Sequence, residues 1–203
     1  MELSNDTLTV SRELSELDKD VLEFTQILDV CEVDYVIVSG YVAILTGRSR
    51  STEDIDVILE SLSETETEQL VTELTDRGYW GMAMPLAEMY SMLSEGSRIR
   101  IAEEGEMYPN FETWFVSNDV EREALSNPLT VTFDAGQIEI SPLELQVAYK
   151  LRLAQAADSL SGKDFEDALH LYLTFEERFN TEQLETYVNE LGVEDYYAEL
   201  KRV

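Results

Sequence analysis

The segment from Val38 to Leu59, VSGYVAILTGRSRSTEDIDVIL, constrains the fold most because it places Asp54 and Asp56 inside an apolar run. A buried carboxylate is costly unless a cation or hydrogen bonds compensate its charge. The pair therefore predicts a positively charged partner, and a divalent metal ion is the candidate.

The pattern around the two aspartates predicts a strand, a short helix and a second strand. Residues 33–40 have the composition of a buried strand, and the apolar residues 41–47 that of a short helix. In the strand over 53–60, alternation of side chains puts Asp54 and Asp56 on the same face. Both carboxylates are thus expected to point in one direction.

The rest of the chain predicts a mixed α/β half followed by a helical half. The apolar spacing indicates a helix over about 11–30, and an acidic first turn indicates another over 64–78. Further expected elements are strands in YWGMAM, SRIRIA and NFETWFV, a helical turn or lid in PLAEMYSMLSEG, a short helix in NDVEREAL, and a hairpin in LTVTFDAGQIEI. We divide the chain into an α/β catalytic core over 1–140, with its N-terminal helix, and a C-terminal helical region over 141–203.

The helical half is expected to begin with a capping box. Ser141 would be the N-cap, Pro142 the first helical residue, and Glu144 the acid three positions after the cap. Two more helices are expected over about 163–177 and 180–200.

The chain combines a formal net charge of −29 with a hydrophobic content of 44%. High charge indicates disorder only when hydrophobicity is low, so we predict a folded protein. Such a surface resembles that of proteins from halophilic archaea, in which molar salt screens self-repulsion. Net charge would not attract nucleic acid, so any contact with it would need a local patch.

The N-terminus lacks the layout of a secretory signal, and no stretch approaches the roughly 20 apolar residues of a membrane span. We therefore expect a cytoplasmic protein without membrane contact. With Cys31 as the only cysteine and His170 as the only histidine, a zinc site with several such ligands is excluded. A metal ion would be bound by oxygen atoms, which favours Mg²⁺ or Mn²⁺.

Acid-x-acid triplets are common by chance in so acidic a chain, with roughly nine expected at this length. The DID triplet differs because it lies in an apolar strand and closely follows Gly40 and the arginines Arg48 and Arg50. This combination singles out the triplet as a candidate site.

These residues resemble the nucleotidyltransferase superfamily with the DNA polymerase β-like fold. Ser39-Gly40 resembles the end of its first strand, and TGRSRSTEDID resembles its Arg-x-Thr-x-Asp-hydrophobic-Asp pattern. The nearest similarity is to small prokaryotic AbiEii toxin-like proteins and related nucleotidyltransferase-like proteins. Residues matching their rear motif are Lys150, Lys163, Asp164 and Asp167. The similarity extends over about 35–173.

The resemblance implies metal-dependent transfer of a nucleoside monophosphate from an NTP. Asp54 and Asp56 would hold Mg²⁺ or Mn²⁺ and act in catalysis. Ser39 and Gly40 would receive the triphosphate. The candidate cations near the phosphates are Arg48, Arg50, Lys150 and Lys163. The acceptor could be an RNA 3′ end, a protein hydroxyl or a small molecule.

Family patterns add a third catalytic carboxylate on a later strand. The corresponding strand over 110–116 offers Glu112, which we rank first, with Asp134 and Glu139 as alternatives. If no third carboxylate faces the pair, the protein would bind nucleotide without turning it over.

Two other classes of function stay open from the sequence. One is a non-catalytic nucleotide-binding or interaction protein of the same fold, such as a toxin–antitoxin component with an antitoxin or a second copy as partner. The other is an adaptor in which the acidic surface is salt adaptation and the cleft is empty.

Overall fold

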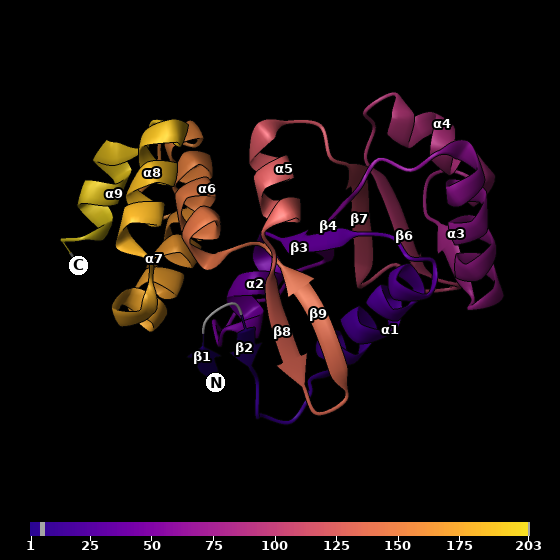
Figure 1. The fold of residues 1–203 in the computed structure, drawn as a ribbon, viewed down its shortest axis with the longest axis horizontal. Helices are drawn as coiled ribbons and strands as arrows, with labels where there is room; N and C mark the ends of the chain where they lie inside the picture. Colours follow the sequence, from indigo (N-terminus) through magenta and orange to yellow (C-terminus); the bar gives the residue numbers. More distant parts are fainter. Residues whose placement is uncertain (5–6, 203) are drawn as a thin grey trace.

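The computed structural model describes residues 1–4 and 7–202, and these residues form one nine-stranded mixed sheet with flanking helices (Figure 1). The strand order is β1-β2-β8-β9-β3-β4-β7-β6-β5. The strands are β1 (Glu2–Ser4), β2 (Thr7–Thr9), β3 (Tyr35–Val38), β4 (Asp54–Leu59), β5 (Tyr79–Gly81), β6 (Ile99–Glu103), β7 (Asn110–Phe115), β8 (Leu129–Phe133) and β9 (Gly136–Ile140). The predicted mixed α/β fold class is confirmed.

The helices gather at the two ends and over the middle of the sheet. They are α1 (Glu16–Val30), α2 (Gly40–Leu45), α3 (Glu64–Asp76), α4 (Met89–Ser94), α5 (Asp119–Ser126), α6 (Leu143–Ala156), α7 (Lys163–Phe175), α8 (Thr181–Leu191) and α9 (Glu194–Leu200). Figure 1 shows α6 to α9 grouped at one end of the molecule and α3 with α4 at the other, with α5 between them. The division into two domains at residue 140 stays a prediction.

The strand that carries the two aspartates lies in the middle of the sheet. It pairs antiparallel with β3, where Val38 is opposite Asp56, and parallel with β7, where Asp54 is opposite Asn110 and Asp56 is opposite Glu112. Asp54 and Asp56 are half-buried, whereas the alternating residue Ile55 is buried on the other face. The predicted strand with both aspartates on one face is confirmed.

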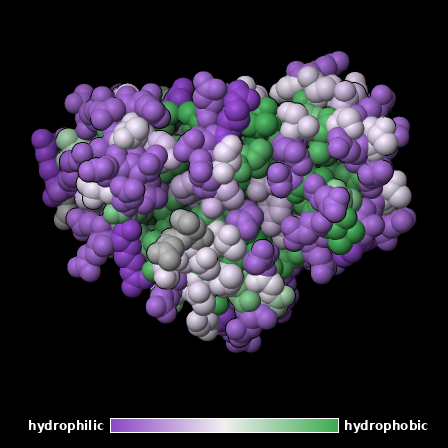
Figure 2. All heavy atoms as spheres, in the orientation of Figure 1, coloured by the Kyte–Doolittle hydropathy of each residue, from purple (hydrophilic) through white to green (hydrophobic). Residues whose placement is uncertain are grey.

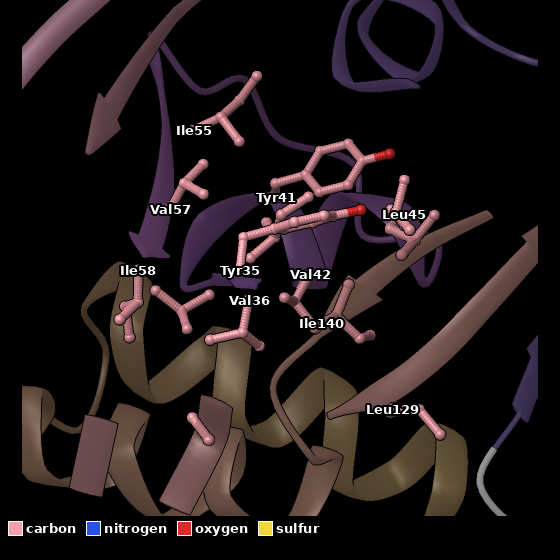
Figure 3. Close-up of a cluster of buried hydrophobic side chains, with 14 of the residues drawn as sticks. Tyr35, Val36, Tyr41, Val42, Leu45, Ile55, Val57, Ile58, Leu129 and Ile140 are labelled. Atoms are coloured by element: carbon pink, nitrogen blue, oxygen red, sulfur yellow. The ribbon is translucent and has the colours of Figure 1, made fainter. Parts of the chain in front are cut away.

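The core forms because β-branched and aromatic residues occupy the inward positions of the central strands. Figure 3 shows part of it, with side chains from β3, α2, β4, β8 and β9 converging. Phe24 of α1 stacks on Phe111 of β7 with ring centroids 3.8 Å apart. Helix α1 is thus fixed against the face of the sheet opposite to the aspartates.

The expected capping box at the start of the helical half is wrong. Helix α6 begins at Leu143, Pro142 is its N-cap, and no side chain caps it. The backbone N–H of Ser141 donates to Ile37 O at 2.9 Å, so this residue continues the strand pairing of β9 instead. Glu144 accepts a hydrogen bond from the backbone of Asn180 at 2.8 Å and thereby supports α8.

Hydrophilic residues cover most of the face drawn in Figure 2, and hydrophobic residues show between them in several places. Within residues 1–4 and 7–202, no helix combines the length and the apolar character that crossing a bilayer requires.

Candidate active site

The two aspartates of β4 lie where the first strand of the motif ends and its short helix begins. Thr52 donates a hydrogen bond to the backbone oxygen of Asp54 at 2.8 Å, and its hydroxyl lies 3.4 Å from the Asp54 carboxylate. Ser39, between β3 and α2, has a positive φ of 66° and hydrogen bonds with Asp56. The local fold thus gathers Ser39, Asp54 and Asp56 at one place.

The charge of Asp56 is poorly compensated. Burial, and secondly the negative charges of Asp54 and Glu112, raise the pKa of Asp56 from 3.8 to about 6. The hydrogen bond from Ser39 and the charge of Arg98 act in the opposite direction. A cation bound between the carboxylates would remove this cost.

Glu112, the first-ranked third carboxylate, lies on the strand next to the pair. It is opposite Asp56 in the register of β4 and β7. Its two oxygens accept hydrogen bonds from Arg98 at 3.0 Å and from Arg100 at 3.2 Å. The guanidinium of Arg98 also lies over the ring of Trp114, 3.8 Å from its centroid. Glu112 is therefore close to Asp56 but held by two arginines.

The two alternative carboxylates lie elsewhere in the fold. Asp134 is exposed in the turn between β8 and β9. Glu139 of β9 accepts hydrogen bonds from Thr130 of β8 at 3.0 and 3.1 Å. Neither strand pairs with β4, so the structure brings only Glu112 of these three into register with Asp56.

Three of the four predicted phosphate-binding cations, all but Lys163, form a cluster around one buried carboxylate. Asp167 of α7 has no exposed surface and makes ion pairs with Arg48, with Arg50 at 2.7 Å and with Lys150 at 3.0 Å. Lys150 is 1% exposed and also pairs with Asp164 at 2.7 Å. Burial lowers the pKa of Lys150, while Asp164 opposes this effect. The cluster joins α6 and α7 to the loop before β4.

The four predicted cations differ in how they lie relative to the Ser39-Gly40 turn. A Cβ atom at Gly40 would lie 3.2 Å from the guanidinium of Arg50 and 3.3 Å from the hydroxyl of Thr52. Arg48 instead donates to the backbone oxygen of Lys163 at 2.8 Å and pairs with Glu166 at 2.5 Å. The side chain of Lys163 is exposed. Arg50 is therefore the cation that the structure places against the glycine turn.

A cavity of about 250 Å³ opens beside Asp56. Its floor is the sheet, where Asp56, Ile58 and Trp114 face it, and its walls come from α5 and α6. The polar groups Ser39 and Gln146 lie near Asp56, because Gln146 donates a hydrogen bond to Ser39 O at 3.0 Å. The cavity thus shares one carboxylate with the candidate site.

The donor set fits a hard divalent ion. Among the described residues, no group of three or more carboxylate, histidine or cysteine side chains is arranged to hold a metal ion. Mg²⁺ usually takes only one or two carboxylates, with water and substrate phosphates as its other ligands. Asp54 and Asp56, separated by two positions on one strand, supply such a pair.

The mixed sheet with its flanking helices matches the fold of solved nucleotidyltransferase structures. No known sequence family and no curated protein sequence matches the chain. Several solved structures have similar folds, including the following three. The lincosamide antibiotic adenylyltransferase LnuA bound to lincomycin gives a TM-score of 0.51 at 18% identity, over 79% of this chain and 98% of that chain.

The second is an antigenic nucleotidyltransferase-like protein from Paracoccidioides brasiliensis, with a TM-score of 0.53 at 16% identity over 93% of this chain and 94% of that chain. The third is ANT(2")-Ia in complex with adenylyl-2"-tobramycin, with a TM-score of 0.53 at 11% identity over 84% of this chain and 94% of that chain. At such low identities the similarity shows the fold.

Sequence reasoning missed Arg98, Trp114 and the role of Asp167. Arg98 directly precedes β6 and Arg100 lies in it, and this spacing of two in a chain with few cations is the signal that they share a carboxylate partner. Asp167 lies among apolar residues of α7, a position where a charged side chain needs a buried partner.

Proposed function

We propose that this protein is a nucleotidyltransferase that transfers a nucleoside monophosphate from an NTP to a hydroxyl group. One observation carries the proposal. Asp54 and Asp56 lie on one face of a central strand, beside the Ser39-Gly40 turn, and Asp56 lines a cavity. The similarity of the fold to structures of nucleotidyltransferases supports it.

Asp54 and Asp56 would hold Mg²⁺ or Mn²⁺, which when bound neutralises charge on the phosphates and orients the α-phosphate. The absence of a side chain at Gly40 would let the phosphates approach the backbone. Arg50 is the cation closest to this turn, so we assign the contact with the triphosphate to it. Arg48, Lys150 and Lys163 would add positive charge near the phosphates.

The reaction would form a bond between the acceptor oxygen and the α-phosphorus and break the bond to the β-phosphate oxygen. Pyrophosphate leaves, and the proton of the acceptor hydroxyl passes to a carboxylate. We propose Glu112 for this role because it is opposite Asp56 in register. It would need to exchange its bonds to Arg98 and Arg100 for the substrate.

Calorimetry of each NTP and of inorganic tripolyphosphate, with Mg²⁺ in molar KCl, tests this proposal. We expect binding by the wild type and loss of binding in Asp54→Asn with Asp56→Asn. Glu53→Gln is the matched control, because Glu53 is an exposed acid beside the pair. Failure of the folded wild type to bind any NTP would overturn the enzyme proposal.

A specific observation favours a second candidate, a nucleotide-binding protein of the same fold without catalysis. Both oxygens of Glu112 are occupied by arginine. In that case Mg²⁺ and NTP would bind at Asp54 and Asp56, and labelled NTP would yield no pyrophosphate with any acceptor. The protein would then act by binding a partner, such as an antitoxin or a second copy of the chain.

A further inference from the structure

The cavity beside Asp56 has one polar end and one apolar end. Ser39 and Gln146 lie at the Asp56 end. Further along β4 the floor is Ile58, which lies opposite Trp114 of β7 in the sheet register. The walls are mostly apolar, with Val120, Ala124, Leu145 and Leu153, and they also include Ser141 and Tyr149, each with one hydroxyl group.

The other charged groups in the described lining are already paired. Arg98 pairs with Glu112 at 3.0 Å and lies over Trp114. Glu121 accepts a hydrogen bond from the indole N–H of Trp114 at 3.0 Å and two from Ser117 at 2.8 Å. The cavity therefore offers no free cation for a triphosphate and no row of free carboxylates for a polyamine.

The size and polarity of the cavity limit its occupant. Its volume of about 250 Å³ lies just below the usual range for ligand pockets, roughly 300 to 1,000 Å³. A nucleobase has several donors and acceptors around its edge, and the few uncharged polar groups of the mostly apolar lining would leave part of them unpaired at a cost. A molecule with an apolar body and a single hydroxyl would match both ends, with the hydroxyl at Asp56.

We propose that this cavity is the acceptor site and that the acceptor is a small, uncharged alcohol with a flat apolar body. This inference rests on the proposed function, whose acceptor it names by class. The alcohol oxygen would bond to the α-phosphorus of the NTP, pyrophosphate would leave, and the product would be a phosphodiester. The alcohol proton would pass to a carboxylate and then to water.

Fluorescence of Trp114 reports directly on the cavity. The chain has two tryptophans, and Trp80 is 37% exposed on β5, outside the cavity. In a Trp80→Phe background, 4-nitrobenzyl alcohol serves as the probe because nitroaromatic compounds quench indole on contact. We expect saturable quenching of Trp114 in molar KCl, and incorporation of label from α-labelled NTP into the alcohol.

A variant in which a larger side chain fills the cavity provides the decisive comparison with the wild type. Ala124 of α5 is 3% exposed and lines the cavity, so Ala124→Leu would occupy its apolar end. We expect affinity for the probe to fall by at least about tenfold, while Mg²⁺-dependent binding of NTP is unchanged. Arg122→Leu is the matched control, since Arg122 is exposed on the same helix. If Ala124→Leu does not fold, Leu153→Phe fills the cavity from α6.

The outcomes separate this inference from the proposed function. If NTP binds but the probe neither quenches Trp114 saturably nor accepts label, the acceptor proposal fails and the enzyme proposal stands. If Ala124→Leu abolishes NTP binding, the cavity holds the nucleoside and the acceptor proposal is overturned. If the probe binds but no NTP does, the proposed function fails, and with it the assignment of the probe as acceptor.

Discussion

Asp56 and Glu112 lie opposite each other in the register of β4 and β7, yet in the described part of the chain only Glu112 has arginine partners. The two neighbouring carboxylates therefore differ in whether an arginine compensates their charge. The unpaired one lines the cavity and lies beside Asp54, where a metal ion would compensate it.

We expect Asp56 to reduce the stability of the metal-free protein near neutral pH. Its folded-state pKa, raised by burial and by Asp54 and Glu112 to about 6, exceeds its ordinary value of 3.8. The stabilising contribution of the protonated form is therefore complete below about pH 4 and is lost as the pH rises through 6. The loss would be up to about 3 kcal/mol.

Urea unfolding in EDTA and molar KCl, from pH 4 to 7, measures this effect. Asp56→Asn should flatten the fall in unfolding free energy that the wild type shows over this range. Glu53→Gln, which changes an exposed acid, should keep the wild-type profile. Identical profiles for Asp56→Asn and wild type would contradict the prediction.

Asp167 is expected to be the most important single charge for stability. Asp167→Asn would leave Arg48, Arg50 and Lys150 close together without their buried carboxylate. Breaking a buried ion pair in this way costs about 3–5 kcal/mol. Glu166→Gln is the matched control, because Glu166 is half exposed and pairs with Arg48; it should cost at most about 1 kcal/mol. Equal losses of unfolding free energy in the two variants would refute the assignment.

Arg50 and Arg48 are expected to differ in nucleotide binding. Arg50 lies against Gly40, whereas Arg48 bonds to Lys163 O and Glu166. Arg50→Lys keeps the charge but loses the guanidinium geometry, so affinity for Mg²⁺-NTP should fall by about tenfold. Arg48→Lys should have a smaller effect in the same calorimetric titration. The reverse order would move the phosphate contact to Arg48.

Glu112→Gln tests the third carboxylate. If Glu112 accepts the acceptor proton, the variant should bind Mg²⁺-NTP normally and release pyrophosphate at least about 100-fold more slowly. Glu139→Gln provides the comparison, because Glu139 bonds to Thr130 away from β4 and should retain activity. Full activity in Glu112→Gln would favour another base.

The sequence predicted the central part of the fold because its signals are local. Alternation in EDIDVILE was enough to place Asp54 and Asp56 on one face, and the structure confirms it. The strands Glu2–Ser4 and Thr7–Thr9 were not predicted because they are short and polar and are held by pairing with each other and with Thr130–Thr132.

The partners of the site residues could not be predicted from local patterns. Arg48 and Asp167 lie 119 positions apart in the chain, and only the packing of α7 brings them together. The same holds for Arg98, whose contact with Glu112 depends on the register of β6 and β7. Likewise, the start of α6 at Leu143 was decided by the bond from Ser141 to Ile37, a tertiary contact.

The two walls of the cavity are anchored unequally, and this has a kinetic consequence. In α5, Ala124 is the buried residue among eight, whereas α6 is buried along most of its length. Local unfolding occurs most readily in segments with few buried contacts. We therefore expect α5 to exchange its amide hydrogens faster than α6, and the rate at which molecules enter and leave the cavity to be set by the outward movement of α5.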